Sequence, residues 1–162
     1  MTPSFLSAFQ KLLGNEGGYV DNPADPGGAT MWGITQRVAR AHGYTGAMQD
    51  LPQSTAMDIA YAEYWKPHQL DALDPLVAFQ VFDAVYNGGP AGRWLQQAAD
   101  IVNTDGIIGP ATIEAVNSEP VSKIIGRFDA YRLLYMAELG EWPNFGRGWA
   151  RRIANNILTG EV

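Results

Sequence analysis

The segment NEGGYVDNPADPGGATMWGIT, residues 15–35, decides how the rest of the chain is interpreted. Its five glycines and two prolines allow neither a long helix nor a long strand. The same segment holds acids and large aromatics: Glu16, Tyr19, Asp21, Asp25 and Trp32. Polar groups and aromatic rings gathered in a tight loop are typical of a ligand-binding cleft.

The composition indicates an ordinary globular protein. The chain has 162 residues, of which 46% are hydrophobic and 17% charged, so we expect one compact domain, with two lobes. A net charge of −6 argues against a nucleic-acid partner, because neutralising phosphates requires clustered cations. The absence of cysteine excludes disulfides, thiolate metal sites and a cysteine nucleophile.

No segment predicts a membrane span, because no run approaches the roughly 20 apolar residues that a bilayer requires. The N-terminal stretch has an apolar face but no charged region before it, so we do not interpret it as a signal peptide. We therefore expect a protein that accumulates in the cytoplasm of the cell that makes it.

Capping signals predict a mainly α architecture. Thr2-Pro3 and Asp74-Pro75 each combine an N-cap residue with proline at the first helical position, and Thr35 is placed to cap a helix that Gly43 closes. TMWGIT, residues 30–35, predicts a small β-hairpin beside the first helix. The remaining helices are expected from Ser54 or Thr55 to Trp65 and over residues 76–87, 91–102, 110–117, 120–139 and 146–158.

Two packed lobes are expected rather than two tethered domains, because Gly88-Gly89-Pro90 breaks the helical pattern without a polar linker. We assign residues 1–89 to one lobe and residues 90–162 to a second, helical lobe packed against it. Four aromatic residues at helical spacing are predicted to be core: Trp65, Phe79, Phe82 and Trp94.

The opening segment predicts a pair of carboxylates in different environments. Glu16 follows the apolar stripe of the first helix, where burial and the negative helix end would raise its pKa, whereas Asp25 lies in a wetter loop. Cleavage of a glycosidic bond needs such a pair: one acid protonates the leaving oxygen, and the other stabilises the cationic centre or activates water. Thr30 is placed to position that water, and Tyr19 and Trp32 offer flat surfaces to sugar rings. The structural alternative is that Glu16 is an exposed helix terminator.

The stretch EGGYVDNPADPGGATMWGIT strongly resembles the signature of the glycoside hydrolase family 108 lysozymes, which are N-acetylmuramidases of phage endolysins and related bacterial proteins. FDAVYNGGPAGRWLQQA and DGIIGPATIEAV resemble the peptidoglycan-binding region that usually follows. Together these motifs cover most of the chain. The resemblance implies a lysozyme-like two-lobed fold, with residues 1–89 as the catalytic lobe and residues 90–162 as the peptidoglycan-binding lobe, and peptidoglycan glycan strands as the substrate. It also implies a protein made in the cytoplasm of the host cell that acts on the periplasmic cell wall after release, with help such as a phage holin.

The resemblance also implies roles for single residues. The residue that matches the catalytic acid of the EGGY motif is Glu16. Phage lysozymes of glycoside hydrolase family 24 carry a similar Glu, Asp and Thr arrangement, to which Glu16, Asp25 and Thr30 correspond. The interval from Asp to Thr is one residue shorter here, so Asp21 and Thr35 stay open as alternatives to Asp25 and Thr30.

Asp83 and Asn87 lie at i and i+4 on one helix face, where they are placed to bind sugar groups across the cleft. The alternative is that they brace the following Gly88-Gly89 turn. DGIIGPAT, residues 105–112, has a structural explanation as a turn followed by a helix start.

No cofactor or metal is expected. His42 and His68 are isolated, and Pro23 stands where a calcium loop needs an oxygen ligand. Arg147, Arg151 and Arg152 form a basic group that would suit an anionic surface, although a solvated helix face is the favoured interpretation.

The sequence thus predicts a monomeric peptidoglycan hydrolase that cleaves the β-1,4 bond between N-acetylmuramic acid and N-acetylglucosamine, with Glu16 as the general acid. Two alternatives stay open. A lytic transglycosylase also uses one glutamate, but a hydroxyl of the substrate closes an anhydro ring in place of water. A non-catalytic peptidoglycan-binding module would account for the C-terminal motifs but not for the EGGY segment.

Overall fold

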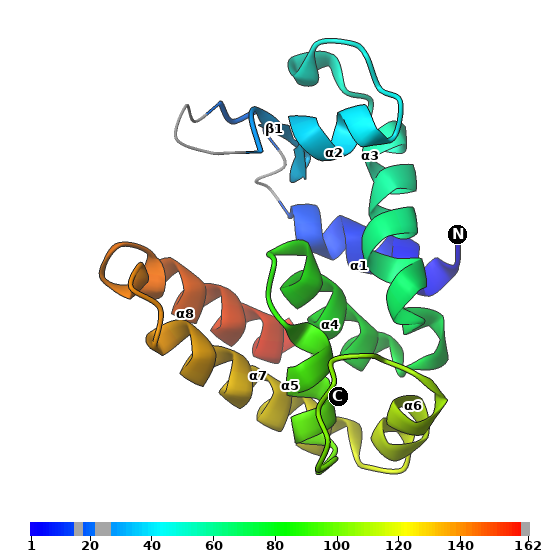
Figure 1. Cartoon of the computed structure of the whole chain (residues 1–162), viewed down its shortest axis with the longest axis vertical. Helices are drawn as coiled ribbons and strands as arrows, with labels where there is room; N and C mark the ends of the chain where they lie inside the picture. The colour runs from blue at the N-terminus through cyan, green and yellow to red at the C-terminus, as the bar shows by residue number, and fades with distance from the viewer. Residues whose placement is uncertain (15–17, 22–26, 160–162) are drawn as a thin grey trace. The chain divides into compact units, whose positions relative to one another are not determined.

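The computed structural model describes residues 1–14, 18–21 and 27–159, and within them eight α-helices and a two-stranded sheet (Figure 1). The helices are α1 Pro3–Leu13, α2 Gln36–Ala41, α3 Gln53–Ala60, α4 Pro75–Tyr86, α5 Ala91–Ala98, α6 Pro110–Asn117, α7 Val121–Ala137 and α8 Trp142–Thr159. The strands are β1 Thr30–Met31 and β2 Ile34–Thr35. The predicted fold class, mainly α with a small hairpin, is confirmed.

The predicted caps begin the helices. The Thr2 hydroxyl accepts a hydrogen bond from the backbone N–H of Phe5, and the Asp74 carboxylate accepts one from the N–H of Leu76 at 2.9 Å. Thr35 caps α2 by accepting from the N–H of Val38. Each contact satisfies an N–H that has no partner within its helix.

Three helices depart from the predicted bounds. α5 ends at Ala98 rather than Val102, and Asp100 beyond it has a left-handed backbone conformation with a φ angle of 58°, which cannot continue the helix. α3 begins at Gln53 and continues into a π-helical turn, Tyr61–Trp65, which a regular helical period does not reveal. α8 begins at Trp142 rather than Gly146, because a proline is tolerated in a first helical turn. A side chain at Gly146 would overlap the Trp142 ring, so the glycine that weakens helix propensity is the residue that lets this turn pack.

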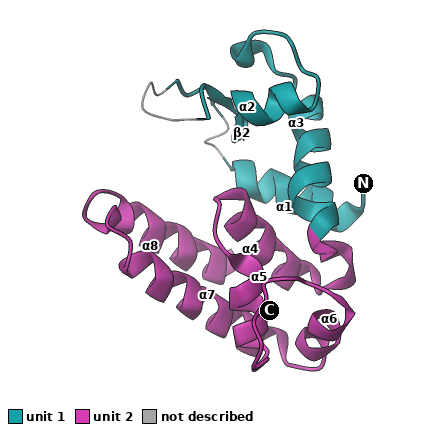
Figure 2. Ribbon diagram, in the orientation of Figure 1, with its two compact units in different colours: residues 1–67 teal, residues 68–162 magenta. Residues whose placement is uncertain are grey.

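By its own contacts the described chain divides into two compact units, Met1–Pro67 and His68–Val162 (Figure 2). In the first unit, the Phe5 ring packs edge-on against Tyr61 and Trp65, with ring centres 4.9 and 5.3 Å away. Phe5, Trp65 and Ile34 are fully buried. α1 and the π-helical turn therefore share one aromatic core.

In the second unit, α7 packs against α4, α5 and α8. Phe82 and Phe128 are buried, and the Trp94 and Phe128 rings meet edge-on with centres 6.0 Å apart. All four predicted core aromatics are buried: Trp65, Phe79, Phe82 and Trp94. The contact-based division after Pro67 places α4 with α5–α8, whereas the division at residues 89–90 was drawn from motifs. The two-lobe assignment of residues 1–89 and 90–162 stays a prediction.

The DGIIGPAT segment is held by hydrogen bonds to the Asp105 side chain. Asp105 accepts hydrogen bonds from the N–H of Ile107 at 2.8 Å and from the Gln96 side chain at 2.6 Å. A side chain at Gly92 of α5 would overlap the Gly106 carbonyl, so this loop lies directly on the helix backbone. The segment thus has the structural explanation that the sequence favoured.

None of the helices in the described ranges is long and apolar enough to cross a membrane.

Candidate functional site

The predicted acids Glu16 and Asp25 lie outside the described residues, so their roles stay predictions. The described residues on either side form the frame of the opening segment. They comprise Val20 before the second gap and the hairpin after it.

Thr30 is fixed between two chain segments. Its N–H donates to the Val20 carbonyl at 2.7 Å, and its carbonyl accepts from the Val20 N–H at 2.9 Å. On its other side Thr30 pairs with Thr35 in the antiparallel β1–β2 ladder. The backbone of Thr30 is therefore the centre of a three-segment arrangement, and its side chain is half-buried there.

The hairpin turn places Trp32 in an unusual conformation. Trp32 and Gly33 have φ angles of 56° and 78°, which is the pattern of a type I′ turn. A bulky residue with positive φ is rare, so such strain is retained where surrounding contacts hold it. The Trp32 indole N–H donates to the Leu51 carbonyl at 2.8 Å, and this bond fixes the ring to the following chain. Stacking of this ring on a sugar stays a prediction.

The start of α2 holds the chain that leads into β1. The N–H groups of Gln36 and Arg37 donate to the carbonyls of Ala29 at 2.8 Å and Gly27 at 3.1 Å. These N–H groups would otherwise lack partners at the helix start. Thr35, the alternative to Thr30, therefore ends β2 and caps α2, whereas Thr30 begins β1.

Tyr19 and Asp21 flank Val20, which forms an isolated β-bridge with Thr30, and both are exposed. The Tyr19 hydroxyl donates to Asp21 Oδ2 at 3.3 Å. Partial desolvation, followed by the nearby Asp21 charge, raises the pKa of the Tyr19 hydroxyl. Tyr19 remains a candidate sugar contact and Asp21 a candidate second acid.

Asp83 of α4 lies in the interior of the second unit, where it is 1% exposed. Its carboxylate accepts from Arg152 Nε and Nη2 at 2.9 and 2.6 Å and from the Asn156 amide at 2.8 Å, and it lies 2.8 Å from Arg132 Nη1. Burial alone would raise the pKa of Asp83, but the Arg152 hydrogen bonds and the Arg132 charge outweigh it and lower the pKa. Asp83 is therefore an ionised anchor that joins α4, α7 and α8.

Arg132 and Asp129 of α7 complete this buried group, and each is 1% exposed. Arg132 Nε and Nη1 have no well-directed hydrogen-bond partner among the described residues, and neither have the two Asp129 oxygens. Burial raises the pKa of Asp129 to about 7, although the Arg132 charge opposes this shift. The sequence analysis did not identify Arg132 or Asp129 as buried charges. The signal that could have indicated them is their spacing, an acid and a base three positions apart among apolar residues of one helix.

Asn87 lies at the end of α4 and is exposed, and its amide donates to the Asp83 carbonyl at 2.6 Å. Asp83 and Asn87 therefore lie one turn apart but in different surroundings. Direct contact of the Asp83 carboxylate with a sugar would require its ion pairs to open. A sugar-binding role stays a prediction for both residues.

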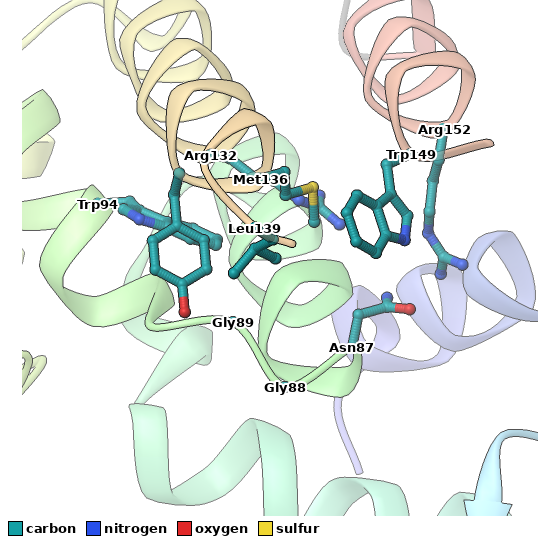
Figure 3. A pocket seen from close by; sticks show the side chains of 10 residues that line it. Asn87, Gly88, Gly89, Trp94, Arg132, Met136, Leu139, Trp149 and Arg152 are labelled. Atoms are coloured by element: carbon teal, nitrogen blue, oxygen red, sulfur yellow. The ribbon is translucent and has the colours of Figure 1, made fainter. Parts of the chain in front are cut away.

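A pocket of about 180 Å³ lies beside this buried group (Figure 3). Its lining comprises Asn87, Gly88, Gly89, Trp94, Arg132, Tyr135, Met136, Leu139, Trp149 and Arg152. Trp149 and Arg152 point from α8 toward Asn87, and the Arg132 guanidinium lies between Met136 and Trp149 (Figure 3). A Cβ at Gly89 would overlap the Trp94 ring, so Gly89 allows the indole to form this wall.

The C-terminal arginines do not act as one group. Arg147 and Arg151 are exposed, as a solvated helix face requires. Arg152 instead binds the buried Asp83 and lines the pocket. Its interpretation as part of a solvated face is therefore wrong, because its partner comes from a helix 69 residues earlier in the chain.

Among the described residues no group of three or more acidic or histidine side chains is placed to hold a metal ion. His42 instead pairs with Glu63, with His42 Nε2 at 2.8 Å from Glu63 Oε1.

Comparisons with known proteins match nearly the whole chain. A family model described as glycosyl hydrolase 108 matches residues 9–89, and one described as a predicted peptidoglycan domain matches residues 91–154. The solved structure of Brucella abortus SagA is 32% identical in sequence, with a TM-score of 0.85. That match covers 97% of this chain and 93% of SagA. A comparison with curated proteins found no match.

Proposed function

Because this chain belongs to the glycosyl hydrolase 108 family, we propose that it is an N-acetylmuramidase, which hydrolyses the β-1,4 bond between N-acetylmuramic acid and N-acetylglucosamine. A glycosidase with a peptidoglycan-binding region is what the family assignment itself supports. The choice of bond and the catalytic residues are our proposal.

One observation carries the proposal: the family match over residues 9–89 includes the complete opening segment and its hairpin. A protein that only binds peptidoglycan would be explained by the second matched region, residues 91–154. It would leave the first matched region, residues 9–89, unexplained. The coincidence of both matches on one chain favours an enzyme whose substrate is peptidoglycan.

In the proposed reaction, Glu16 donates its proton to the leaving glycosidic oxygen as the bond to the anomeric carbon breaks. Water adds its hydroxyl to that carbon, and its proton passes to a carboxylate. Asp25 stabilises the positive charge at the carbon or activates the water, and the Thr30 hydroxyl positions the water. The double hydrogen bonding between Thr30 and Val20 supports this role, because a positioning residue requires a fixed backbone.

Sugar binding is proposed for the aromatic rings of Tyr19 and Trp32 and for the amide of Asn87. The hydrogen bond from Trp32 to Leu51 supports this role for the indole, because a fixed ring loses little freedom when a sugar stacks on it. A monomeric state, action on the periplasmic wall and dependence on a holin stay predictions.

The test is the mass of the products released from purified peptidoglycan. Hydrolysis yields fragments that end in reducing N-acetylmuramic acid, whereas a lytic transglycosylase yields anhydro ends that are lighter by one water. The Glu16→Gln variant is the matched control, since an amide cannot supply the proton, and its activity should fall at least about a hundredfold. Anhydro products, or full turnover by a folded Glu16→Gln variant, would overturn the proposal.

A further inference from the structure

We propose that the pocket of the second unit binds a carboxylate group of the peptide stems of peptidoglycan, with Arg132 and Arg152 as the cationic side and Trp149 as the apolar wall. The inference rests on the proposed function in that it takes peptidoglycan as the ligand. It adds which part of that polymer the second unit recognises.

The charge of the pocket favours an anion. Its ionisable lining residues, within the described part of the chain, are two arginines and one tyrosine, with no acid among them. Asp83 behind the lining supplies one negative charge against the two guanidinium groups. The pKa of Asp129, raised to about 7, reduces the compensation from that side chain. A surplus positive charge in a chain of net charge −6 marks a local site for a singly charged anion.

The two guanidinium groups are held in place before any ligand binds. Asp83 fixes Arg152 through Nε and Nη2, at 2.9 and 2.6 Å. Arg132 is 1% exposed, its Nη1 lies 2.8 Å from Asp83 Oδ2, and its Nε has no hydrogen-bond partner among the described residues. A buried donor without a partner is costly, so a ligand oxygen that accepts from this guanidinium group gains more than it would at an exposed arginine.

The apolar wall suits a peptide rather than a simple ion. Trp94, Met136, Leu139 and Trp149 line the pocket beside the two arginines. The Phe145 ring stacks on Trp149 with ring centres 5.9 Å apart, and Phe145 is 56% exposed, so apolar surface continues outside the pocket. At about 180 Å³ this pocket is smaller than the roughly 300–1,000 Å³ of pockets that enclose a whole small-molecule ligand, so it fits one end group of a larger polymer.

The peptide stems and the sugars of peptidoglycan differ in charge. In a glycan strand that carries stems, the lactyl carboxyl of N-acetylmuramic acid is joined in an amide, and the sugars present neutral hydroxyl and acetamido groups. Free carboxylates then lie on the stems. A strand without stems has free lactyl carboxylates instead, so it provides the second source of the same chemistry.

The test is isothermal titration calorimetry on the wild-type chain with three soluble ligands. The first is an N-acetylglucosaminyl-N-acetylmuramyl peptide, which lacks the bond that the enzyme is proposed to cleave. The second is the same compound with its carboxyl groups amidated, and the third is the disaccharide with a free lactyl group and no peptide. We expect the first to bind at least about tenfold more tightly than the other two, as loss of a charge-assisted contact predicts.

Variants locate the binding in the pocket. Arg152→Gln and Trp149→Ala should each weaken binding of the peptide-bearing ligand at least about fivefold. Arg151→Gln is the matched control, since it removes the same charge from an exposed position of the same helix. Trp149→Ala leaves the Asp83 ion pairs in place, and it tests the proposal even where Arg152→Gln fails to fold.

Three results would overturn the proposal: equal binding of the amidated ligand, equal binding of the disaccharide without peptide, or equal losses in Arg151→Gln and Arg152→Gln. The product analysis of the wild-type chain reports separately on cleavage. Hydrolysis without preference for a carboxylate overturns only the stem site. Preference for the carboxylate without hydrolysis overturns only the proposed function.

Discussion

Asp83 Oδ1 on α4 lies 2.6 Å from Arg152 Nη2 on α8, although the two residues are 69 positions apart in the chain. The same carboxylate lies 2.8 Å from Arg132 Nη1 on α7. One buried charge therefore fixes three helices and orients two arginines at the pocket. Such a group is strongly coupled, because removing one member leaves the others buried without compensation.

Replacing Asp83 with asparagine should lower the free energy of unfolding by about 3–5 kcal/mol, because Arg132 would keep its buried charge without a carboxylate. Urea denaturation followed by circular dichroism measures the change. Glu114→Gln, on an exposed position of α6, is the control and should change stability by less than about 0.5 kcal/mol. Equal stabilities of the two variants would show that the ion pairs do not stabilise the unit.

Asp129 should make stability fall as the pH rises. Its pKa is raised to about 7 in the folded state, so between about pH 4 and 7 the unfolded chain loses a proton that the folded chain keeps. This cost is absent below about pH 4 and complete above about pH 7. We therefore compare the free energy of unfolding of Asp129→Asn with that of the wild type. The difference should shift in favour of the variant by roughly 1–3 kcal/mol between pH 5 and pH 8. Parallel stability curves of wild type and variant from pH 4 to 8 would contradict this assignment.

Contacts within a few residues of the chain could be predicted from the sequence, whereas contacts between helices could not. The Thr2, Thr35 and Asp74 caps were predictable because each cap acts on a backbone N–H two or three residues away. Arg132 and Arg152 were not recognised as partners of Asp83, because side chains on different helices meet only after the helices pack. The hairpin followed from a local turn signal, whereas its attachment through Trp32 to Leu51 spans 19 residues.

The choice of second acid can be tested by two variants. Asp25→Asn should lower activity roughly tenfold or more, since electrostatic support of the reaction is only partly replaceable. Asp21 is exposed and accepts a hydrogen bond from Tyr19, so Asp21→Asn should change activity less. Rates of peptidoglycan solubilisation compare the two. An active Asp25→Asn variant beside an inactive Asp21→Asn variant would make Asp21 the second acid.

The exposed arginines should act only at low salt. The double variant Arg147→Gln, Arg151→Gln changes the net charge from −6 to −8 and should slow lysis of outer-membrane-stripped cells about two- to fivefold at low ionic strength. At about 0.15 M salt the Debye length is only about 8 Å, so most of this loss should disappear. Arg152→Gln should instead lower stability at every salt concentration, since its ion pair with Asp83 is half-buried. A salt-independent loss in the double variant would indicate a packing role.

The position of the domain boundary can be tested by cutting the chain at the two alternatives. A fragment of residues 68–162 keeps α4 with α5, α7 and α8 and retains every partner of the Asp83 carboxylate described above, so it should be helical and unfold cooperatively.

A fragment of residues 1–89 keeps α4 but loses α7 and α8. The surface of α4 that packs against α5 and α7 would then be uncovered, and the Asp83 carboxylate would lose both arginines. We therefore expect this fragment to aggregate or to show no cooperative transition, because an uncovered apolar face favours association. Circular dichroism melting and size-exclusion chromatography of the two fragments distinguish the boundaries. A monomeric 1–89 fragment that unfolds cooperatively and cleaves peptidoglycan would show that α4 belongs with the N-terminal lobe, as the motifs predict.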